Sequence, residues 1–201
     1  MSHYKKKSIK IAVKLMNILD IKNVLDIACG DGKHLIEFKN LGCNCYGTEY
    51  DAWLEKLGQE KGINMISGGI FPSKPYENIS FDLVIFTEII EHINNPRKVL
   101  MNIHYLLNKD GILYITTPNF NSIERKVLGK NWGMICYPEH ISYYSPKTLH
   151  KLLTQCGFEK IYLYTENISI FRIVQYMQRR KAKKRYTAKP RVNLSASSKF
   201  I

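Results

Sequence analysis

The chain has 201 residues and a formal net charge of +13, and hydrophobic residues make up 45% of its composition. This length and apolar content fit one globular domain with a buried core and exclude a chain too polar to fold. The charge sits at the ends: residues 1–14 hold five lysines and residues 172–201 hold ten Lys or Arg, with no acid in either. The other 15 basic and 17 acidic residues give residues 15–171 a net charge of −2, which argues against a nucleic-acid surface on the body.

The amino terminus has basic residues but no long apolar segment and no small-residue cleavage site, and no run approaches the roughly 20 apolar residues of a membrane span. We therefore expect a cytoplasmic protein. Residues 1–171 are predicted to form a single domain, and residues 172–201 a basic carboxyl-terminal tail that is disordered in one interpretation.

Apolar periodicity predicts strands that alternate with helices along the chain. The expected helices are 9–19, 32–42, 51–63, 96–107 and 145–157, and the expected strands are 23–29, 43–49, 64–67, 81–87, 111–118 and 158–169. Asp51 is suited to cap the third helix, Pro96 to open the fourth, and Gly157 to end the last. This alternation predicts an α/β fold with a doubly wound, mostly parallel sheet of six strands. Residues 186–194 are the only candidate for a seventh.

The first strand runs into the turn Ala28-Cys29-Gly30-Asp31-Gly32, which lies where ligands bind in such sheets. Small residues there let a ligand approach the backbone. Glu49 follows Gly30 by 19 residues and ends the second strand, where a carboxylate can accept hydrogen bonds from both hydroxyls of a ribose. The glycine-bearing turn and the acid at the end of the next strand together predict a nucleotide site.

The dinucleotide fingerprint G-x-G-x-x-G is absent, because Leu35 and Lys33 stand where it requires glycine. Carboxylates at Asp26 and Asp31 repel a pyrophosphate and suit a cationic ligand with an amino group and a sulfonium. A nicotinamide-dependent dehydrogenase is therefore excluded, and a Walker A loop is also absent.

The ordered segments "VLDIACGDG", "YGTEYD", "FDLVIFTEIIEHINNPRKVL" and "GILYITTPN" resemble the motifs of class I S-adenosylmethionine-dependent methyltransferases over residues 20–165. The segments "TEIIEHINNP" and "YPEHISYYSPKTLHKLLTQCGF" are similar to the small group that includes ubiquinone-biosynthesis O-methyltransferases and saccharide-pathway enzymes. The resemblance implies S-adenosylmethionine as cofactor. Two departures stand out: Ala28 replaces the usual first glycine, and residues 67–70 lack the acid that often holds the adenine amine.

The resemblance also implies roles for individual residues. Glu49 would hold the ribose, Tyr50 would pack beside the adenine, and Thr87 would lie near the methionine moiety. The residues that would line the methionine end of the cofactor are Asp26, Ala28, Gly30 and Gly32.

Glu88, Glu91 and His92 are the candidates for acceptor activation, because positions i, i+3 and i+4 share one face of a helical turn. His140 is a fourth candidate, since methyltransferases with E-x-x-E-H and a later histidine include metal-dependent ones. Three interpretations stay open: a Mg²⁺, Mn²⁺ or Zn²⁺ site, His92 or His140 as a metal-free general base, and residues that only cap the helix or pack.

Aromatic residues at 132, 137, 143 and 144 fit either a cover over an apolar or ring-shaped acceptor or the packing of the sheet edge. Residues 168–191 combine apolar positions with a basic run. They fit a peripheral contact with an anionic membrane, attachment to nucleic acid, or a final helix with a solvated tail.

The leading hypothesis is a methyltransferase that acts on a hydroxyl or amine of a small molecule, lipid-linked quinone precursor or saccharide. The alternatives are an RNA methyltransferase, which the near-neutral body argues against, and a non-catalytic binding module that keeps the fold.

Overall fold

The computed structural model describes residues 20–68, 76, 78–165 and 173–178. The chain divides into two compact units, one formed by Met1–Phe120 with Cys136–Tyr164 and the other by Asn121–Ile135 with Thr165–Ile201. The expected opening helix at 9–19 and the candidate strand at 186–194 lie outside the described residues. The domain boundary expected at residue 171 stays a prediction.

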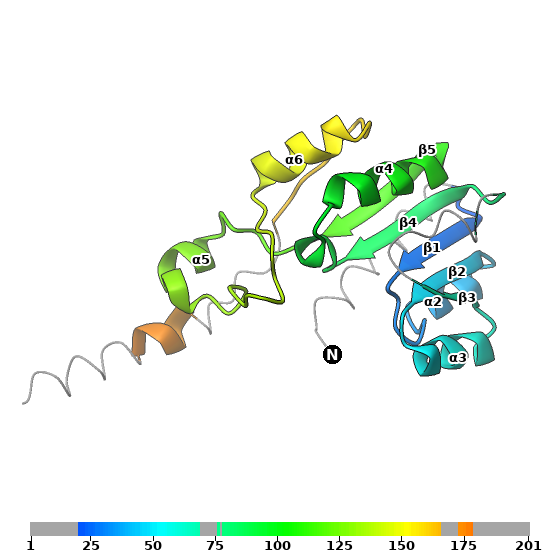
Figure 1. Cartoon of the computed structure of the whole chain (residues 1–201), viewed down its shortest axis with the longest axis horizontal. Helices are drawn as coiled ribbons and strands as arrows, with labels where there is room; N and C mark the ends of the chain where they lie inside the picture. The colour runs from blue at the N-terminus through cyan, green and yellow to red at the C-terminus, as the bar shows by residue number, and fades with distance from the viewer. Residues whose placement is uncertain (1–19, 69–75, 77, 166–172, 179–201) are drawn as a thin grey trace, which may run out of the picture. The chain divides into compact units, whose positions relative to one another are not determined.

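The first unit is built on a parallel five-stranded sheet in the order β3-β2-β1-β4-β5 (Figure 1). Consecutive strands lie on both sides of β1, so the winding reverses between β1 and β4. This arrangement confirms the doubly wound α/β class. The strands are β1 (Asn23–Ile27), β2 (Asn44–Glu49), β3 (Asn64–Ser67), β4 (Phe81–Thr87) and β5 (Leu107–Thr116).

Helices connect the strands, and their ends follow the capping residues in the sequence. The Asp51 side chain accepts the backbone N–H groups of Trp53 and Leu54, and Pro96 occupies the first turn of its helix. Ser145 forms a reciprocal capping box with Thr148. The helices among the described residues of this unit are α2 (Leu35–Asn40), α3 (Ala52–Glu60), the short 3-10 helix η1 (Ile90–His92), α4 (Pro96–Leu106) and α6 (Pro146–Gln155).

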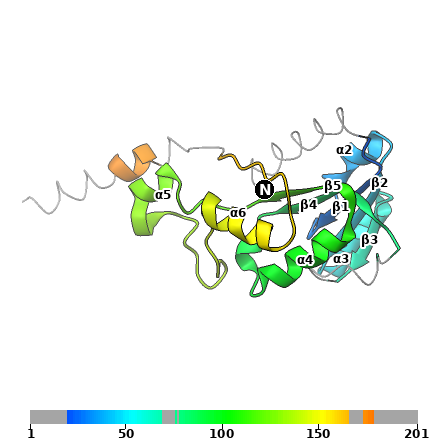
Figure 2. The same cartoon turned by 90° about the horizontal axis from the view of Figure 1, so that it is seen from above.

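The central strands β1 and β4 are buried on both faces, as strands inside a parallel sheet are, whereas the residues of β5 are half-buried or exposed. Along β4, alternate residues point to opposite sides, so Leu83 and Ile85 join one apolar cluster while Val84 and Phe86 join the other. The first cluster includes Leu35 and Phe38 of α2, and the second includes residues of α4 and α6 (Figure 2). The two layers of helices hold the strand ends in fixed positions.

The sheet has five strands in the described residues, so the expectation of six is wrong for that part of the chain. Residues 158–165 do not form a strand, although their sequence alternates. Phe158 and Ile161 instead pack against the α4 and α6 side of the core, while Tyr162 and Tyr164 are exposed. A strand needs a neighbouring strand to which its backbone can hydrogen-bond. This segment buries its apolar side chains against the core without pairing with such a neighbour.

Asp82 fastens the amino ends of three strands. Its carboxylate accepts the backbone N–H groups of Lys22 and Asn23 at 2.8 and 2.9 Å and the side-chain amide of Asn108. Partial burial opposes ionisation of this carboxyl, but these hydrogen bonds outweigh it, and the pKa of Asp82 lies below its usual value.

We expect Asp82→Ala to lower the free energy of unfolding by about 2 kcal/mol, since hydrogen bonds to a charged group are lost. Because the folded-state pKa is depressed, this stabilisation is present at neutral pH and disappears as pH falls through the folded-state pKa. Urea unfolding at neutral and acidic pH measures both effects. The exposed Asp110→Ala is the control, and equal stability of the two variants at neutral pH would contradict the expectation.

The second unit contains α5 (Ile123–Leu128), the 3-10 helix η2 (Gly129–Asn131) and helical residues 173–178. Ser122 caps α5 by accepting the N–H of Arg125. Val174 and Met177 are 42% and 52% exposed and lie three positions apart, so they fall on the same side of their helix. No helix among the described residues combines the length and apolar character needed to cross a membrane.

Candidate functional site

The turn after β1 has an unusual backbone. Ala28, Gly30 and Gly32 all have positive φ, at 54°, 63° and 66°. Glycine adopts this conformation readily, but an alanine does so at a cost. The Ala28 N–H bonds to Thr48 Oγ1 at 3.3 Å, and the Cys29 N–H bonds to the Thr48 carbonyl at 3.0 Å, so β2 holds the start of the turn.

The glycines of the turn serve different purposes. A Cβ atom at Gly30 would have no heavy atom within 4 Å, so open space lies beside the backbone there. A Cβ atom at Gly32 would lie 2.5 Å from Cδ1 of Ile63, so that glycine permits close packing. The turn is therefore fixed on one side and accessible on the other, as a ligand-binding turn must be.

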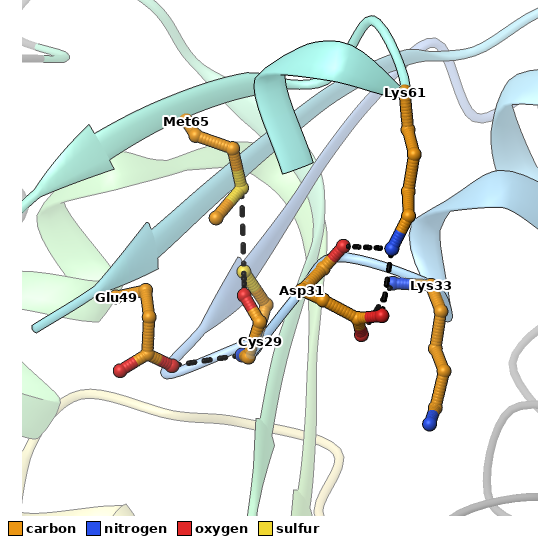
Figure 3. Close-up of polar contacts among 7 residues, drawn as sticks. Cys29, Asp31, Lys33, Glu49, Lys61 and Met65 are labelled. Carbon is orange, nitrogen blue, oxygen red and sulfur yellow. Dashed lines mark hydrogen bonds and ion pairs between the residues drawn. The ribbon is translucent and has the colours of Figure 1, made fainter. Parts of the chain in front are cut away.

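The carboxylate of Glu49 joins the end of β2 to this turn (Figure 3). Its Oε2 atom accepts the Gly30 N–H at 2.8 Å, and its Oε1 atom accepts the N–H groups of Tyr50 and Asp51 at 2.7 and 3.3 Å. A carboxylate offers about four lone-pair positions, so one remains for a ligand hydroxyl. Tyr50 is 69% exposed beside it, which leaves its ring accessible.

Asp31 does not present a free negative charge to a ligand, contrary to the expectation from the sequence. Lys61 Nζ lies 2.6 Å from Asp31 Oδ2 and 2.8 Å from the Asp31 carbonyl oxygen (Figure 3). The hydrogen bond from Lys61 lowers the pKa of the Asp31 carboxyl, although partial burial opposes this. The other acid on which the expected cationic ligand depended, Asp26, is 5% exposed near the end of β1.

Replacing Ala28 by glycine should restore the residue type that the backbone favours. We expect Ala28→Gly to raise the free energy of unfolding by about 0.5–1 kcal/mol, because relief of the positive φ exceeds the entropy cost of a glycine. Thermal unfolding measures the change. Ala52→Gly, in the first turn of α3, is the matched control and should destabilise. A loss of stability in Ala28→Gly would show that its methyl group packs usefully.

A second cluster lies at the carboxyl ends of β4 and β5. Glu91, His92 and His140 bring one ligand atom each within 4.8 Å of one another. The rings of His92 and His140 meet edge to face with centroids 4.7 Å apart. Glu88 is not a member, because it has a positive φ of 56° and precedes a 3-10 helix that spans only residues 90–92. The helical turn expected to align Glu88 with Glu91 and His92 is therefore absent.

Glu91 is held in a buried position, with 2% of its surface exposed. Its Oε2 atom accepts the Thr117 hydroxyl at 2.9 Å, and its Oε1 atom is buried without a hydrogen-bond partner. Burial raises the pKa of this carboxyl. Its backbone carbonyl accepts the N–H groups of Ile141 and Ser142, which fixes the segment that carries His140.

The tautomer of neutral His92 follows from one contact. Its Nδ1 atom lies 2.7 Å from the Glu139 carbonyl oxygen, and a carbonyl oxygen can only accept. Nδ1 therefore carries the proton, and Nε2 presents a lone pair. An exposed imidazole with a fixed acceptor nitrogen is suited to remove a proton or to bind a metal.

Thr87, the remaining residue expected near the cofactor, is 7% exposed at the last position of β4. Asp26 of β1 is paired with Ile85 of β4, two residues before Thr87. The turn after β1 and the cluster after β4 thus lie at the carboxyl ends of adjacent parallel strands, where the winding reverses. Both groups of residues flank the position where this kind of sheet binds ligands.

The aromatic residues expected to cover an acceptor divide into different environments. Tyr144 is 8% exposed and belongs to the apolar core, which fits the packing alternative, whereas Tyr137 is 81% exposed. The Tyr143 hydroxyl is buried without a hydrogen-bond partner. Trp132 belongs to the second unit.

A model of the family described as "Methyltransferase domain" matches residues 4–163, so the chain belongs to that family. Among curated relatives, the C-methyltransferase NovU of Streptomyces niveus is 23% identical over 168 residues, which cover 81% of this chain and 39% of the relative. A ubiquinone biosynthesis O-methyltransferase of Bradyrhizobium sp. is 28% identical over 152 residues, 70% of this chain and 59% of the relative. A tRNA U34 carboxymethyltransferase of Photobacterium profundum is 22% identical over 158 residues, 74% of this chain and 48% of the relative.

Each of these three relatives is covered over less than two thirds of its own length. Among solved structures, an S-adenosylmethionine-dependent methyltransferase from Archaeoglobus fulgidus superposes with a TM-score of 0.60 at 19% identity, covering 90% of this chain and 87% of that chain. This likeness confirms the fold.

Proposed function

We propose that the chain binds S-adenosylmethionine at the carboxyl ends of β1 and β2. We further propose that it transfers the methyl group to a hydroxyl, or an amine, of a small molecule, quinone precursor or saccharide. The observation that carries the proposal is the open turn at Gly30, bonded to Glu49, beside the cluster of Glu91, His92 and His140. Family membership supports the same reaction class.

The residues of the turn fit the cofactor chemically. Gly30 leaves space beside the backbone, and Glu49 retains one acceptor position for a ribose hydroxyl. The exposed ring of Tyr50 is suited to pack on adenine, while Asp26, Ala28, Gly32 and Thr87 would surround the methionine end. S-adenosylmethionine supplies an already activated sulfonium methyl group when it is bound.

Acceptor activation is the remaining task, and His92 is the residue we assign to it. Its Nε2 atom would take the proton of the acceptor hydroxyl as the oxygen bonds to the methyl carbon and the carbon–sulfur bond breaks. The Glu139 carbonyl keeps the imidazole in the required tautomer. Glu91 and His140 lie beside the ring, where a carboxylate would stabilise the imidazolium that forms.

A divalent metal held by the same cluster is the alternative means of activation. One carboxylate and two imidazoles suit Zn²⁺ or Mn²⁺ better than Mg²⁺, which prefers oxygen. Atoms bound to one zinc ion lie roughly 3.4 Å apart, so side chains spread over as much as 4.8 Å would have to move together. Glu91 Oε1, which has no partner, is the group that a metal would satisfy.

Isothermal titration of the purified protein with S-adenosylhomocysteine tests the cofactor site, with NADH as the control ligand. Saturable binding of S-adenosylhomocysteine alone supports the proposal, and no binding at millimolar concentration would favour a binding module that retains the fold. Transfer of radiolabelled methyl groups to a panel of phenols, amines, saccharides and RNA then identifies the acceptor class. The −2 charge of residues 15–171 favours a small molecule over RNA.

Contact with an anionic membrane through residues 168–191 stays a prediction. The exposed Val174 and Met177 support it in the described part of that segment.

A further inference from the structure

The last three residues of the turn are each held by a residue between the end of β2 and the start of β3, and Figure 3 shows the contacts of Glu49 and Lys61. Glu49 accepts the Gly30 N–H, Lys61 binds Asp31, and Ile63 packs against Gly32. Glu49 ends β2, and Gly32 lies next to the apolar core. Lys61 is 30 residues from Asp31 in sequence, and the turn alone gives no reason for it.

Lys61 makes two contacts with Asp31 at once. Its ammonium donates to the Asp31 carbonyl at 2.8 Å and to the Asp31 carboxylate at 2.6 Å. The main chain of Lys61 is itself fixed, because its carbonyl accepts the Lys39 ammonium of α2 at 2.7 Å. One side chain therefore joins the turn to the end of α3, and α2 holds that end from the other side.

The turn needs such a restraint, since three of its five residues have positive φ and one of these is an alanine. The hydrogen bond from the Lys61 ammonium to the Asp31 carbonyl fixes the Asp31–Gly32 peptide, next to Gly30, where the open space lies. Lys61 lies outside the motif and has no expected contact with the ligand.

Building on the proposed function, we infer that Lys61 is a positioning residue for the cofactor turn. Its double contact with Asp31 holds the backbone of residues 30–32 in the ligand-binding conformation. The residue acts through the turn, so its loss weakens cofactor binding with little effect on methyl transfer at saturating cofactor.

The expected size of the effect is modest, because the side chains of the pair are about one third exposed and solvent screens them. Lys61→Met should raise the dissociation constant of S-adenosylhomocysteine about five- to tenfold in isothermal titration. Lys61→Arg should stay within about twofold of the unsubstituted chain, because a guanidinium can donate to both oxygens. Asp31→Asn should weaken binding, and combining it with Lys61→Met should add little.

Two controls separate positioning from loss of stability. Lys56→Met removes an exposed lysine from α3, the helix that ends just before Lys61, and should leave the affinity unchanged. Asp82→Ala removes hydrogen bonds at the amino ends of the strands, so it should lower the melting temperature. It should leave the affinity for S-adenosylhomocysteine unchanged. If Lys61→Met does not fold, Asp31→Asn takes its place in the same titration.

The outcomes are distinguishable. If the unsubstituted chain does not bind S-adenosylhomocysteine, the proposed function fails and this inference fails with it. If it binds and Lys61→Met, or Asp31→Asn in its place, binds equally well, the positioning role alone is refuted. An equal loss of affinity in Asp82→Ala would also refute it, because the effect would then follow from stability.

Discussion

Glu49→Gln is expected to raise the dissociation constant of S-adenosylhomocysteine by about 10- to 100-fold while changing the melting temperature little. The free acceptor position of the carboxylate would bond to one ribose hydroxyl, and a hydrogen bond to a charged group contributes about 1.5–3 kcal/mol. A factor of ten in affinity corresponds to about 1.4 kcal/mol. Isothermal titration and thermal unfolding of the same preparations measure the two quantities.

Glutamine is a better choice than alanine because of the three backbone N–H groups that Glu49 accepts. Its amide oxygen can keep the bonds to Tyr50 and Asp51, while its amide nitrogen would face the Gly30 N–H and cannot accept it; an alanine would leave all three donors without their acceptor. We expect Glu49→Ala to lose stability as well, by about 1–3 kcal/mol. The glutamine variant keeps the bonds at the start of α3, so its loss of affinity reports on the ribose bond together with the Gly30 bond of the turn.

Glu37→Gln, an exposed change on α2, removes the same charge away from the turn and should leave the affinity unaltered. Unchanged affinity in Glu49→Gln would remove the ribose role from this residue. A fall in melting temperature as large as that of Glu49→Ala would instead assign the carboxylate a structural role.

The second large effect is expected at His92. His92→Asn should lower kcat for methyl transfer about 10²- to 10⁴-fold, the usual contribution of a general base. The asparagine amide occupies the position of Nδ1 and can still donate to the Glu139 carbonyl, so the segment that carries His140 should keep its anchor. The affinity for S-adenosylhomocysteine should stay unchanged, because the cofactor turn is built from other residues.

The assay uses radiolabelled S-adenosylmethionine with the acceptor found by screening, and the exposed His150→Asn on α6 is the matched control. Activity of the unsubstituted chain should persist in excess chelator if His92 acts as a metal-free base. Loss of activity in chelator, restored by Zn²⁺ or Mn²⁺, would favour the metal alternative. Full activity of His92→Asn would exclude both roles for this imidazole.

Several local features follow from the sequence because short-range chemistry decides them. Asp51, Pro96 and Ser145 begin helices where they stand, since a capping side chain needs only the next few N–H groups. The alternation of buried strands with helices likewise determines the sheet class, because only helices on both faces cover a parallel sheet. The spacing of Gly30 and Glu49 predicted a shared nucleotide site, and the structure adds a direct hydrogen bond between the two residues that the spacing did not predict.

Other features were wrong or invisible in the sequence because they depend on distant partners. Glu88 satisfied a helical spacing, but its positive φ and the short η1 remove it from the cluster of Glu91, His92 and His140. The apolar alternation after residue 157 resembled a strand, yet nothing in sequence says whether a neighbouring backbone is available to pair with it.

Residue types and spacing by themselves determined that this chain folds as a doubly wound, mostly parallel α/β sheet with a glycine-bearing turn after the first strand, and the resemblance of its motifs pointed to the methyltransferases. The tertiary structure decided which charged groups of the site are paired and which tautomer His92 adopts. Asp31 is paired with Lys61 across 30 residues, and Glu139 fixes the tautomer of His92 across 47. Electrostatic pairing depends on distance in space, and periodicity along the chain reports only on neighbours within a helix or strand.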